Sequence, residues 1–352
     1  MEKVFSAQLQ GGKSSDVYFS SSRESVDEKL REFGGNSLFV FDSNTAGLLS
    51  ADGRNSIVLP NGEEYKTLES VQMILDKALS LSLSRDSVFV AVGGGVICDM
   101  TAFAASVYMR GARAVLVPTT LLSQVDASVG GKCGVDYNGY KNLVGSFFPA
   151  ESIFIDSEML LSLPDSEFIS GMGEVVKHAF LSPDRRLYDF LYENSRRILG
   201  RDAESLSDMV RLSLEVKKHY IELDPEETRG IRSFLNLGHT FSHALETVTG
   251  YSVSHGLGVA WGVQKAMDAG VIAGITPQPY RDEASALLSL FPFRMDYDPS
   301  GDLDGYIDAI GKDKKKQNGH VRFVLMKGQG EPVLSELSQD VVISAVASGA
   351  DI

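Results

Sequence analysis

Residues 88–103, VFVAVGGGVICDMTAF, run from an apolar, β-branched segment through three glycines into a segment of helical composition. The apolar run, which begins at residue 87, is typical of a strand buried on both faces of a parallel sheet. Glycine lets a backbone approach a pyrophosphate closely, and the N-terminus of the next helix offers free N–H groups. The stretch predicts a nucleotide-binding turn at Gly94 and Gly95. The alternative is a tight strand-to-helix connection without a ligand.

Strand and helix signals alternate on both sides of this turn. We expect strands at 37–44, 56–60 and 114–120, and helices at 65–83 and through 100–109. From residue 157 the pattern changes to long helical segments, namely 168–181, 201–223, 239–248 and 257–274, followed by a strand at 320–326 and a final helix. The sequence therefore predicts a Rossmann-like α/β domain in residues 1–156 and a mainly α-helical domain in residues 157–352.

Composition restricts the class of protein. The length of 352 residues suits two domains, and 43% hydrophobic with 23% charged residues is typical of a soluble globular protein. A net charge of −14 argues against a nucleic-acid partner but leaves small anions open. No apolar run reaches the roughly 18 residues of a membrane span, and no signal peptide is evident. With Cys98 and Cys133 as its two cysteines, the chain fits a reducing cytoplasm.

Polar residues at the ends of the predicted strands are candidates for contact with a dinucleotide. Asp42 and Asn44 end one strand, where an acid that binds ribose is expected. Thr119 and Thr120 end another strand. We expect Asp99 in the first turn of the helix after the glycines, where it would either stabilise the helix dipole or contact the nucleotide.

Three of the six histidines, His239, His243 and His255, lie close together in LNLGHTFSHALETVTGYSVSHG (235–256). His239 and His243 are spaced i, i+4 and project from one helix face. Alone, such a pair more often packs or caps than binds a metal, but a third nearby histidine favours a metal site. Spacing alone would make all three histidines ligands.

Four further segments carry a family resemblance: PTTLLSQVDASVGGKCGVDYNGYKNLVGSFFP (118–149), GMGEVVKH (171–178), LNLGHTFSHALE (235–246) and KDKKKQNGHVRFVL (312–325). In this order and spacing the sequence resembles the 3-dehydroquinate synthase family from about residue 37 to about residue 330. The resemblance implies NAD on the Rossmann-like domain, one divalent metal (Zn²⁺ or Co²⁺), a small anionic sugar-phosphate substrate and a homodimer.

The reaction implied by the resemblance belongs to the shikimate pathway. It is the conversion of 3-deoxy-D-arabino-heptulosonate 7-phosphate to 3-dehydroquinate and phosphate. NAD transiently oxidises the substrate, phosphate is eliminated, the hydride returns, and an intramolecular aldol step closes the ring.

The resemblance also implies roles for individual residues. It assigns the metal to Glu174, His239 and His255, and moves His243 to the substrate pocket. Without the resemblance, the alternative for Glu174 and Lys177 is an ion pair on a solvated helix face, which the small and apolar residues around them disfavour. The implied catalytic residues are Asp126, Lys132, Asn142, Lys177 and His243. Implied substrate contacts are Arg110, Lys132, Lys141, Asn142, Lys217, Arg232, Asn236, His243 and Lys314, with Glu227 carried over less directly. Implied cofactor contacts are Asp42, Asn44, Glu63, Lys66, Gly94, Gly95, Asp99, Thr119, Thr120 and Lys141.

Several positions depart from the common family pattern. Ser242 stands where glycine is common, and Cys133 replaces a frequent threonine. From His255 the chain reads HGLGVAWG (255–262), where many family members have an acidic or other residue followed by alanine. The segment DPEETRGIR (224–232) is one residue longer than usual. The alternatives that remain are another sugar-phosphate cyclase, such as a 2-epi-5-epi-valiolone or 2-deoxy-scyllo-inosose synthase, a metal-dependent NAD polyol dehydrogenase, and a non-catalytic paralogue.

Overall fold

The computed structural model separates into two compact units. Unit 1 comprises Met1–Pro164 with Ile221–Glu227, and unit 2 comprises Asp165–Tyr220 with Thr228–Ile352. The structure describes residues 1–9, 12, 14–20, 22–49, 53–225, 227–316 and 321–347, and residues 300 and 312–316 by their backbone alone. The domain boundary expected after residue 156, with one role for each domain, stays a prediction.

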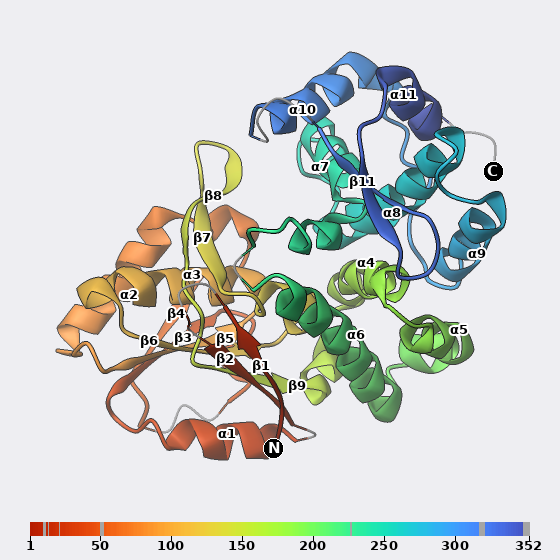
Figure 1. Ribbon diagram of the computed structural model, residues 1–352. Helices are drawn as coiled ribbons and strands as arrows, with labels where there is room; N and C mark the ends of the chain where they lie inside the picture. Colours follow the sequence, from red (N-terminus) through yellow and green to blue (C-terminus); the bar gives the residue numbers. More distant parts are fainter. Residues whose placement is uncertain are drawn as a thin grey trace. The chain divides into compact units, whose positions relative to one another are not determined.

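Within the described residues, unit 1 is built on a seven-stranded sheet of order β1-β2-β9-β6-β5-β3-β4 (Figure 1). Its strands are β1 (Glu2–Gln8), β2 (Ser14–Ser20), β3 (Ser37–Asp42), β4 (Ser56–Leu59), β5 (Val88–Gly93), β6 (Arg113–Pro118) and β9 (Ser152–Asp156). β1 is antiparallel to β2, and the other neighbouring strands are parallel. The predicted Rossmann-like parallel sheet is confirmed.

Helices cover both faces of this sheet, with α1 (Arg23–Arg31) on one face and α2 (Leu68–Ser80) and α3 (Gly95–Val107) on the other (Figure 1). Because side chains alternate along a strand, Phe39 and Phe41 of β3 share one face. They belong to one buried cluster with Val26 and Leu30 of α1. Burial on both faces explains why these strands have near-continuous apolar sequences.

Parts of unit 1 were not predicted from the sequence. β1 and β2 are rich in serine and charged residues, yet β2 pairs in parallel with β9. A separate antiparallel hairpin, β7 (Lys132–Tyr137) and β8 (Tyr140–Phe147), packs against α3. The hairpin includes several residues that the sequence analysis assigns to substrate.

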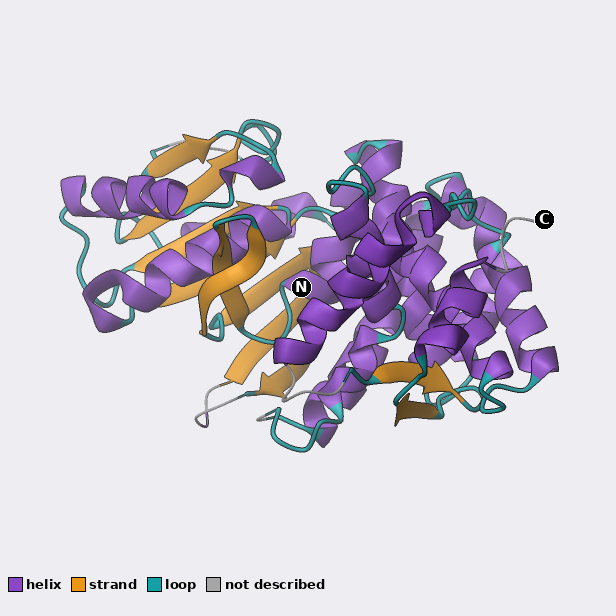
Figure 2. Cartoon of the chain, turned by 90° about the horizontal axis from the view of Figure 1, so that it is seen from above, coloured by secondary structure: helices purple, strands orange, loops and turns teal. Residues whose placement is uncertain are grey.

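Unit 2 is mainly helical (Figure 2). Its helices are α4 (Asp165–Leu181), α5 (Arg186–Leu199), α6 (Ala203–Leu223, whose last three residues group with unit 1), α7 (His239–Val248), α8 (His255–Ile272), α9 (Gln278–Leu288), α10 (Leu303–Lys316) and α11 (Gln339–Ala347). A short hairpin joins β10 (Phe323–Met326) and β11 (Pro332–Ser335). α8 packs against α4, α7, α9 and α11, so it is the central helix of the unit. Its Trp261 is fully buried and meets Tyr306 of α10 edge to face, with ring centroids 6.4 Å apart.

The last residue of β9, Asp156, makes stability in unit 1 sensitive to pH. It is fully buried, and burial raises the pKa of its carboxyl to about 6. The folded state disfavours the ionised form of this carboxyl. The contribution of Asp156 to the free energy of unfolding is therefore greatest below the ordinary pKa of 3.8 and is lost as the pH rises through 6. We expect Asp156→Asn to raise stability at pH 8 by about 1–3 kcal/mol, and by much less at pH 4. The amide oxygen of the variant would still accept the hydrogen bond that Glu158 N–H donates at 3.0 Å. Denaturant unfolding of both proteins at the two pH values measures this, and an equal difference at both would contradict it.

Candidate functional site

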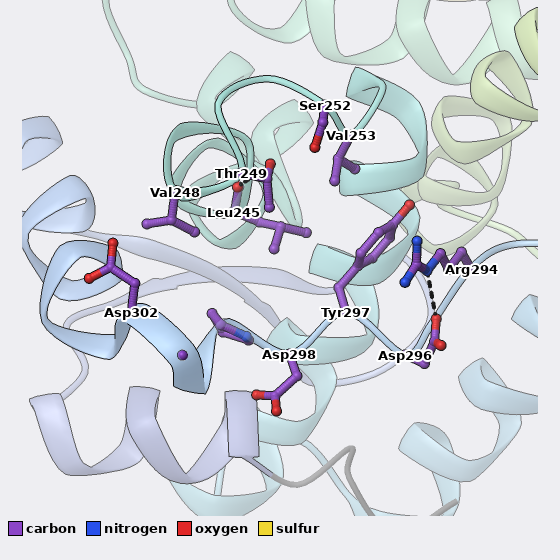
Figure 3. Close-up of a pocket in the computed structure, with 12 residues that line it drawn as sticks. Leu245, Val248, Thr249, Ser252, Val253, Arg294, Asp296, Tyr297, Asp298 and Asp302 are labelled. Carbon is purple, nitrogen blue, oxygen red and sulfur yellow. Dashed lines mark hydrogen bonds and ion pairs between the residues drawn. The ribbon is translucent and has the colours of Figure 1, made fainter.

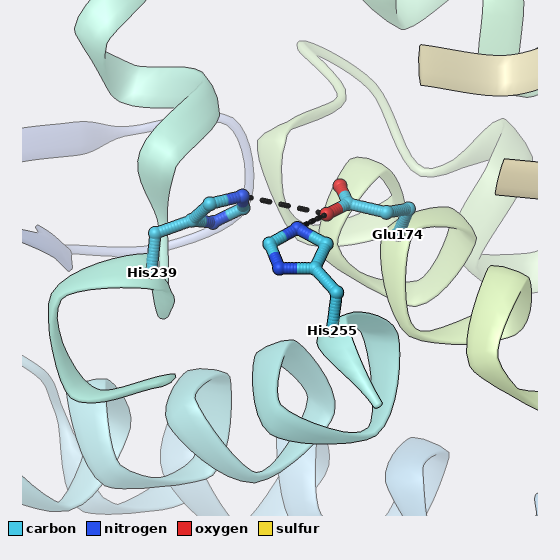
Figure 4. A group of neighbouring side chains, drawn as sticks. All are labelled: Glu174, His239 and His255. Atoms are coloured by element: carbon cyan, nitrogen blue, oxygen red, sulfur yellow. Dashed lines mark ion pairs between the residues drawn. The ribbon is translucent and has the colours of Figure 1, made fainter. Parts of the chain in front are cut away.

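Three side chains from three helices of unit 2 converge on one point (Figure 4). Glu174 comes from the middle of α4, and His239 and His255 are the first residues of α7 and α8. Nε2 of His239 lies 3.4 Å and Nε2 of His255 lies 3.3 Å from the same oxygen, Oε1 of Glu174. The Glu174 side chain is fully buried.

Glycines bring the three helices close enough for this convergence. A Cβ on Gly173 would lie 1.9 Å from the carbonyl oxygen of Gly256, so α4 and α8 touch backbone to backbone. Gly238, just before α7, has φ +82°, and a Cβ there would lie 2.7 Å from the amide nitrogen of Val263. Larger residues at Gly173 or Gly238 would push apart the helices that carry Glu174, His239 and His255.

The other nitrogen of each histidine ring, Nδ1, lies within hydrogen-bond distance of an oxygen. Nδ1 of His255 lies 3.0 Å from Oε1 of Glu246, and Nδ1 of His239 lies 3.3 Å from the carbonyl oxygen of Leu237. These acceptors keep a ring proton on Nδ1, so Nε2 of each ring is the atom that would bind a metal placed between the rings and Glu174. This is the arrangement of metal-binding histidines in proteins.

The electrostatics of the group also suit a cation. Burial opposes ionisation of Glu174, but Lys177 and His239 hold the pKa of its carboxyl well below the usual range. Burial would lower the pKa of His255, yet Glu174 and Glu246 raise it to about 10. Oε2 of Glu174 is paired with Lys177, while Oε1 faces both imidazoles. Two imidazoles and one carboxylate oxygen at this point fit Zn²⁺ or Co²⁺, which would displace a proton on binding.

Lys177 lies one turn after Glu174 on α4 and forms an ion pair with it. The side chains are 1% and 0% exposed, so the alternative of a solvated surface pair is wrong. A buried pair of this kind is retained at a cost in desolvation, which is typical of a functional site.

His243 lies beside this group but is not part of it. Its ring centroid is 5.5 Å from that of His239 and 6.0 Å from that of His255, and the residue is exposed. The structure thus separates His243 from the two histidines that face Glu174. Spacing alone had predicted three equivalent ligands.

The other candidates in unit 2 are placed as follows. Lys217 and Arg232 are buried, whereas Asn236 is exposed at the end of the short helix η6 (Arg232–Asn236). Lys314 lies on α10, and its side chain is outside the described residues. His178, for which the sequence analysis expected no role, is buried with Nδ1 2.7 Å from Ser213 Oγ.

In unit 1 several of the predicted cofactor residues lie at the carboxyl ends of adjacent parallel strands. Asp42 ends β3, Gly94 caps the N-terminus of α3 directly after β5, and Thr119 follows β6. Thr119 N–H donates to Gly93 O at 2.9 Å, which ties two strand ends together. One oxygen of Asp42 accepts hydrogen bonds from the N–H groups of Asn44 and Thr45, both at 2.9 Å. This edge is where open α/β sheets bind nucleotides.

The glycine that packing requires is Gly93, which the sequence analysis did not select. A Cβ at Gly93 would lie 2.6 Å from Cβ of Ile97, an impossible contact. At Gly94 it would come 3.1 Å from Thr120 Cγ2, and at Gly95 it would make an ordinary 3.5 Å contact with Ala127. A side chain at Gly94 would therefore press on Thr120, whereas a small one at Gly95 would fit.

A polar network joins Lys66, which is buried, to the partly exposed Asp99 and the exposed Asn142. Lys66 Nζ lies 2.7 Å from Asp99 Oδ2 and donates to Asn142 Oδ1 at 2.5 Å. Burial lowers the pKa of Lys66, but the carboxylates of Asp99, Glu63 and Asp136 together outweigh it and hold that pKa above its ordinary value. The expectation that Asp99 occupies the first turn of its helix is wrong, because α3 begins at Gly95 and Asp99 is its fifth residue. Asp99 is thus a counterion of Lys66 and not a dipole-stabilising residue.

The remaining candidates of unit 1 are less enclosed. Arg110, Glu63 and Lys141 are exposed. Lys132 is 61% exposed and lies 2.7 Å from Glu227 Oε1. Asp126 belongs to a π-helical turn, η4 (Ser123–Ala127), and such turns occur frequently at functional sites.

Two family models match consecutive parts of the chain. The model described as 3-dehydroquinate synthase N-terminal matches residues 56–170, and the one described as 3-dehydroquinate synthase C-terminal matches residues 171–316. The chain belongs to the 3-dehydroquinate synthase family. The resemblance noted in the sequence is thereby confirmed.

Curated relatives agree with membership of the 3-dehydroquinate synthase family. A 3-dehydroquinate synthase of Sulfurovum sp. is 40% identical over 288 residues, which is 81% of this chain and 80% of the relative. A bifunctional 3-dehydroquinate synthase/phosphatase of Fusobacterium nucleatum is 36% identical over 334 residues, and the match spans 94% of this chain but 46% of that longer protein.

Among solved structures, a 2-epi-5-epi-valiolone synthase of Streptomyces hygroscopicus with NAD⁺ and Zn²⁺ bound has a TM-score of 0.86 at 22% identity, covering 96% of this chain and 97% of that one. A 2-deoxy-scyllo-inosose synthase complexed with carbaglucose-6-phosphate, NAD⁺ and Co²⁺ has a TM-score of 0.85 at 22% identity, covering 98% and 99%. At this level of identity the likeness shows the fold.

Glu246, whose carboxylate accepts a hydrogen bond from Nδ1 of His255, was not predicted from the sequence. Its signal was present in HTFSHALE, where Ser242 and Glu246 are spaced i, i+4 on the helix of His239. Two departures from the family pattern, Ser242 and Gly258, lie against each other in the structure, since a Cβ on Gly258 would lie 2.4 Å from Ser242 Oγ.

A separate pocket of unit 2 shares none of the predicted site residues (Figure 3). It is lined by Leu245 and Val248 of α7 and by Arg294, Asp296 and Tyr297, with Arg294 Nε donating to Asp296 at 2.9 Å.

No helix among the described residues combines the length and the apolar character needed to cross a membrane.

Proposed function

We propose that this chain is a 3-dehydroquinate synthase, a carbon–oxygen lyase that converts 3-deoxy-D-arabino-heptulosonate 7-phosphate to 3-dehydroquinate and phosphate. The observation that carries the proposal is the buried group of Glu174, His239 and His255 in a chain of this family. The donors suit a divalent metal, with both Nδ1 atoms already engaged.

The proposal includes NAD and one divalent metal, Zn²⁺ or Co²⁺. When bound, the metal supplies Lewis-acid polarisation of a substrate oxygen, and NAD supplies a reversible hydride acceptor. Glu174, His239 and His255 would hold the metal. Asp42, Gly94, Gly95, Asp99, Thr119 and Thr120 would bind NAD at the strand ends of unit 1, supported by their common edge of the sheet.

The chain's own groups would bind and orient the substrate. The substrate carries a carboxylate and a phosphate, which cations and amides bind by charge-assisted hydrogen bonds. We assign this to Arg110, Lys132, Lys141, Asn142, Lys217, Arg232, Asn236 and Lys314. His243, exposed beside the metal group, would exchange a proton with the substrate phosphate or a water. We further propose a homodimer that works in the cytoplasm.

The test is phosphate release from 3-deoxy-D-arabino-heptulosonate 7-phosphate with catalytic NAD, with and without a chelator, while 3-dehydroquinate is followed in parallel. We expect equal amounts of phosphate and product, loss of both with the chelator, and no net NADH. Release from sedoheptulose 7-phosphate alone would instead identify another sugar-phosphate cyclase. Stoichiometric NADH from a polyol would identify a dehydrogenase.

A further inference from the structure

Ser242 and Glu246 form a buried pair directly behind His255. Both lie on one face of α7, at i and i+4, and their exposed fractions are 0% and 2%. Ser242 Oγ donates to Glu246 Oε1 at 3.0 Å, and His255 Nδ1 lies 3.0 Å from that same oxygen. One carboxylate oxygen therefore accepts from the serine hydroxyl and from the imidazole together.

Gly258 provides the space that the hydroxyl occupies. It lies one turn after His255 on α8, and a Cβ there would lie 2.4 Å from Ser242 Oγ and 3.4 Å from Glu246 Oε1. The first distance is too short for any real contact. A side chain at residue 258 therefore requires the hydroxyl of Ser242 or the helix that carries it to move away from its present position.

We propose that Ser242 is a positioning residue of the metal centre, acting through Glu246 on His255, and that Gly258 is required for that action. This inference rests on the proposed metal site. Ser242 holds Glu246 Oε1 in place, Glu246 fixes the tautomer and ring plane of His255, and His255 Nε2 is thereby aimed at Glu174. A helix serine commonly bonds back to a carbonyl four residues earlier, but the hydroxyl of Ser242 bonds forward to a carboxylate instead.

The first test removes the hydroxyl with Ser242→Ala. Metal affinity is measured by competition with a chelator, and the visible absorption spectrum of the Co²⁺-loaded protein reports ligand geometry. We expect affinity to fall about threefold to tenfold and the Co²⁺ bands to shift, since the hydrogen bond is to a charged, buried acceptor. The matched control is Ser195→Ala in α5, which deletes a buried hydroxyl away from His255 and should leave both readouts unchanged.

The second test places a methyl group at residue 258 in two backgrounds. With Ser242 present, Gly258→Ala should weaken metal binding about tenfold, because the methyl group displaces the hydroxyl. In the Ser242→Gly background the same change should cost little, because the space is free. Gly270→Ala, on the same helix as Gly258, is the control, since its Cβ would lie 1.9 Å from Oγ1 of Thr276 in the loop that follows. It should destabilise the fold without the change in the Co²⁺ spectrum.

The outcomes separate this inference from the proposed function. Stoichiometric metal in the unaltered protein, with affinity and spectrum unchanged in Ser242→Ala, would overturn the role of Ser242 and leave the enzyme assignment standing. Equal costs of Gly258→Ala in both backgrounds would overturn the requirement for Gly258. An unaltered protein that binds no metal would overturn both proposals.

Discussion

Glu174→Gln is expected to lose the metal. The amide keeps the shape of the side chain but lacks the negative charge toward which both Nε2 atoms point, at 3.3 and 3.4 Å. Loss of a metal worth several kcal/mol of transition-state stabilisation should reduce turnover to below about a thousandth. Metal content after gel filtration and phosphate release in the same sample measure the two effects.

The same substitution leaves Lys177 buried without its counterion. Because both side chains are almost fully buried, this should cost about 3–5 kcal/mol of stability. A second variant, Glu174→Gln with Lys177→Met, separates folding from metal binding. It should regain most of the stability and still bind no metal. Stoichiometric metal in a folded Glu174→Gln protein would contradict the assignment of Glu174 as a ligand.

The sheet of unit 1 was predictable where burial dictates composition. β3 and β5 are enclosed on both faces, so their sequences are runs of apolar residues that end at Asp42 and at the glycines. β1 and β2 carry no such signal. They are placed by pairing with each other and with β9, a contact between residues more than 130 positions apart that local pattern cannot show.

The candidate site was predictable in part for a related reason. The i, i+4 spacing shows that His239 and His243 share one face of a helix, but not which ring turns toward a carboxylate on another helix. That depends on α4 and on the glycine contact between Gly173 and Gly256. Likewise, Asp99 was identified as a candidate, but its partner Lys66 lies on a different element and appears only in the folded chain.

His243→Ala is expected to keep the metal and to lose most turnover. The ring lies outside the group that faces Glu174, yet its centroid is 5.5 Å from that of His239. A side chain in this position that transfers a proton accounts for about a 10²–10⁴-fold effect on rate. Metal content, affinity and kcat are to be measured on one preparation, with His219→Ala as the control. His219 lies on α6 next to Tyr220 and should be replaceable with little loss.

The two histidines next to His255 can be told apart by this comparison. If His243→Ala releases the metal, the simple spacing argument for three histidine ligands is right. Glu174 is then the ion-pair partner of Lys177 and not a metal ligand. If the metal stays and kcat falls, the division made by the structure holds. His239 then binds the metal because its Nδ1 is held by Leu237 O and its Nε2 faces Glu174. One turn later on the same helix, His243 is left exposed for the substrate.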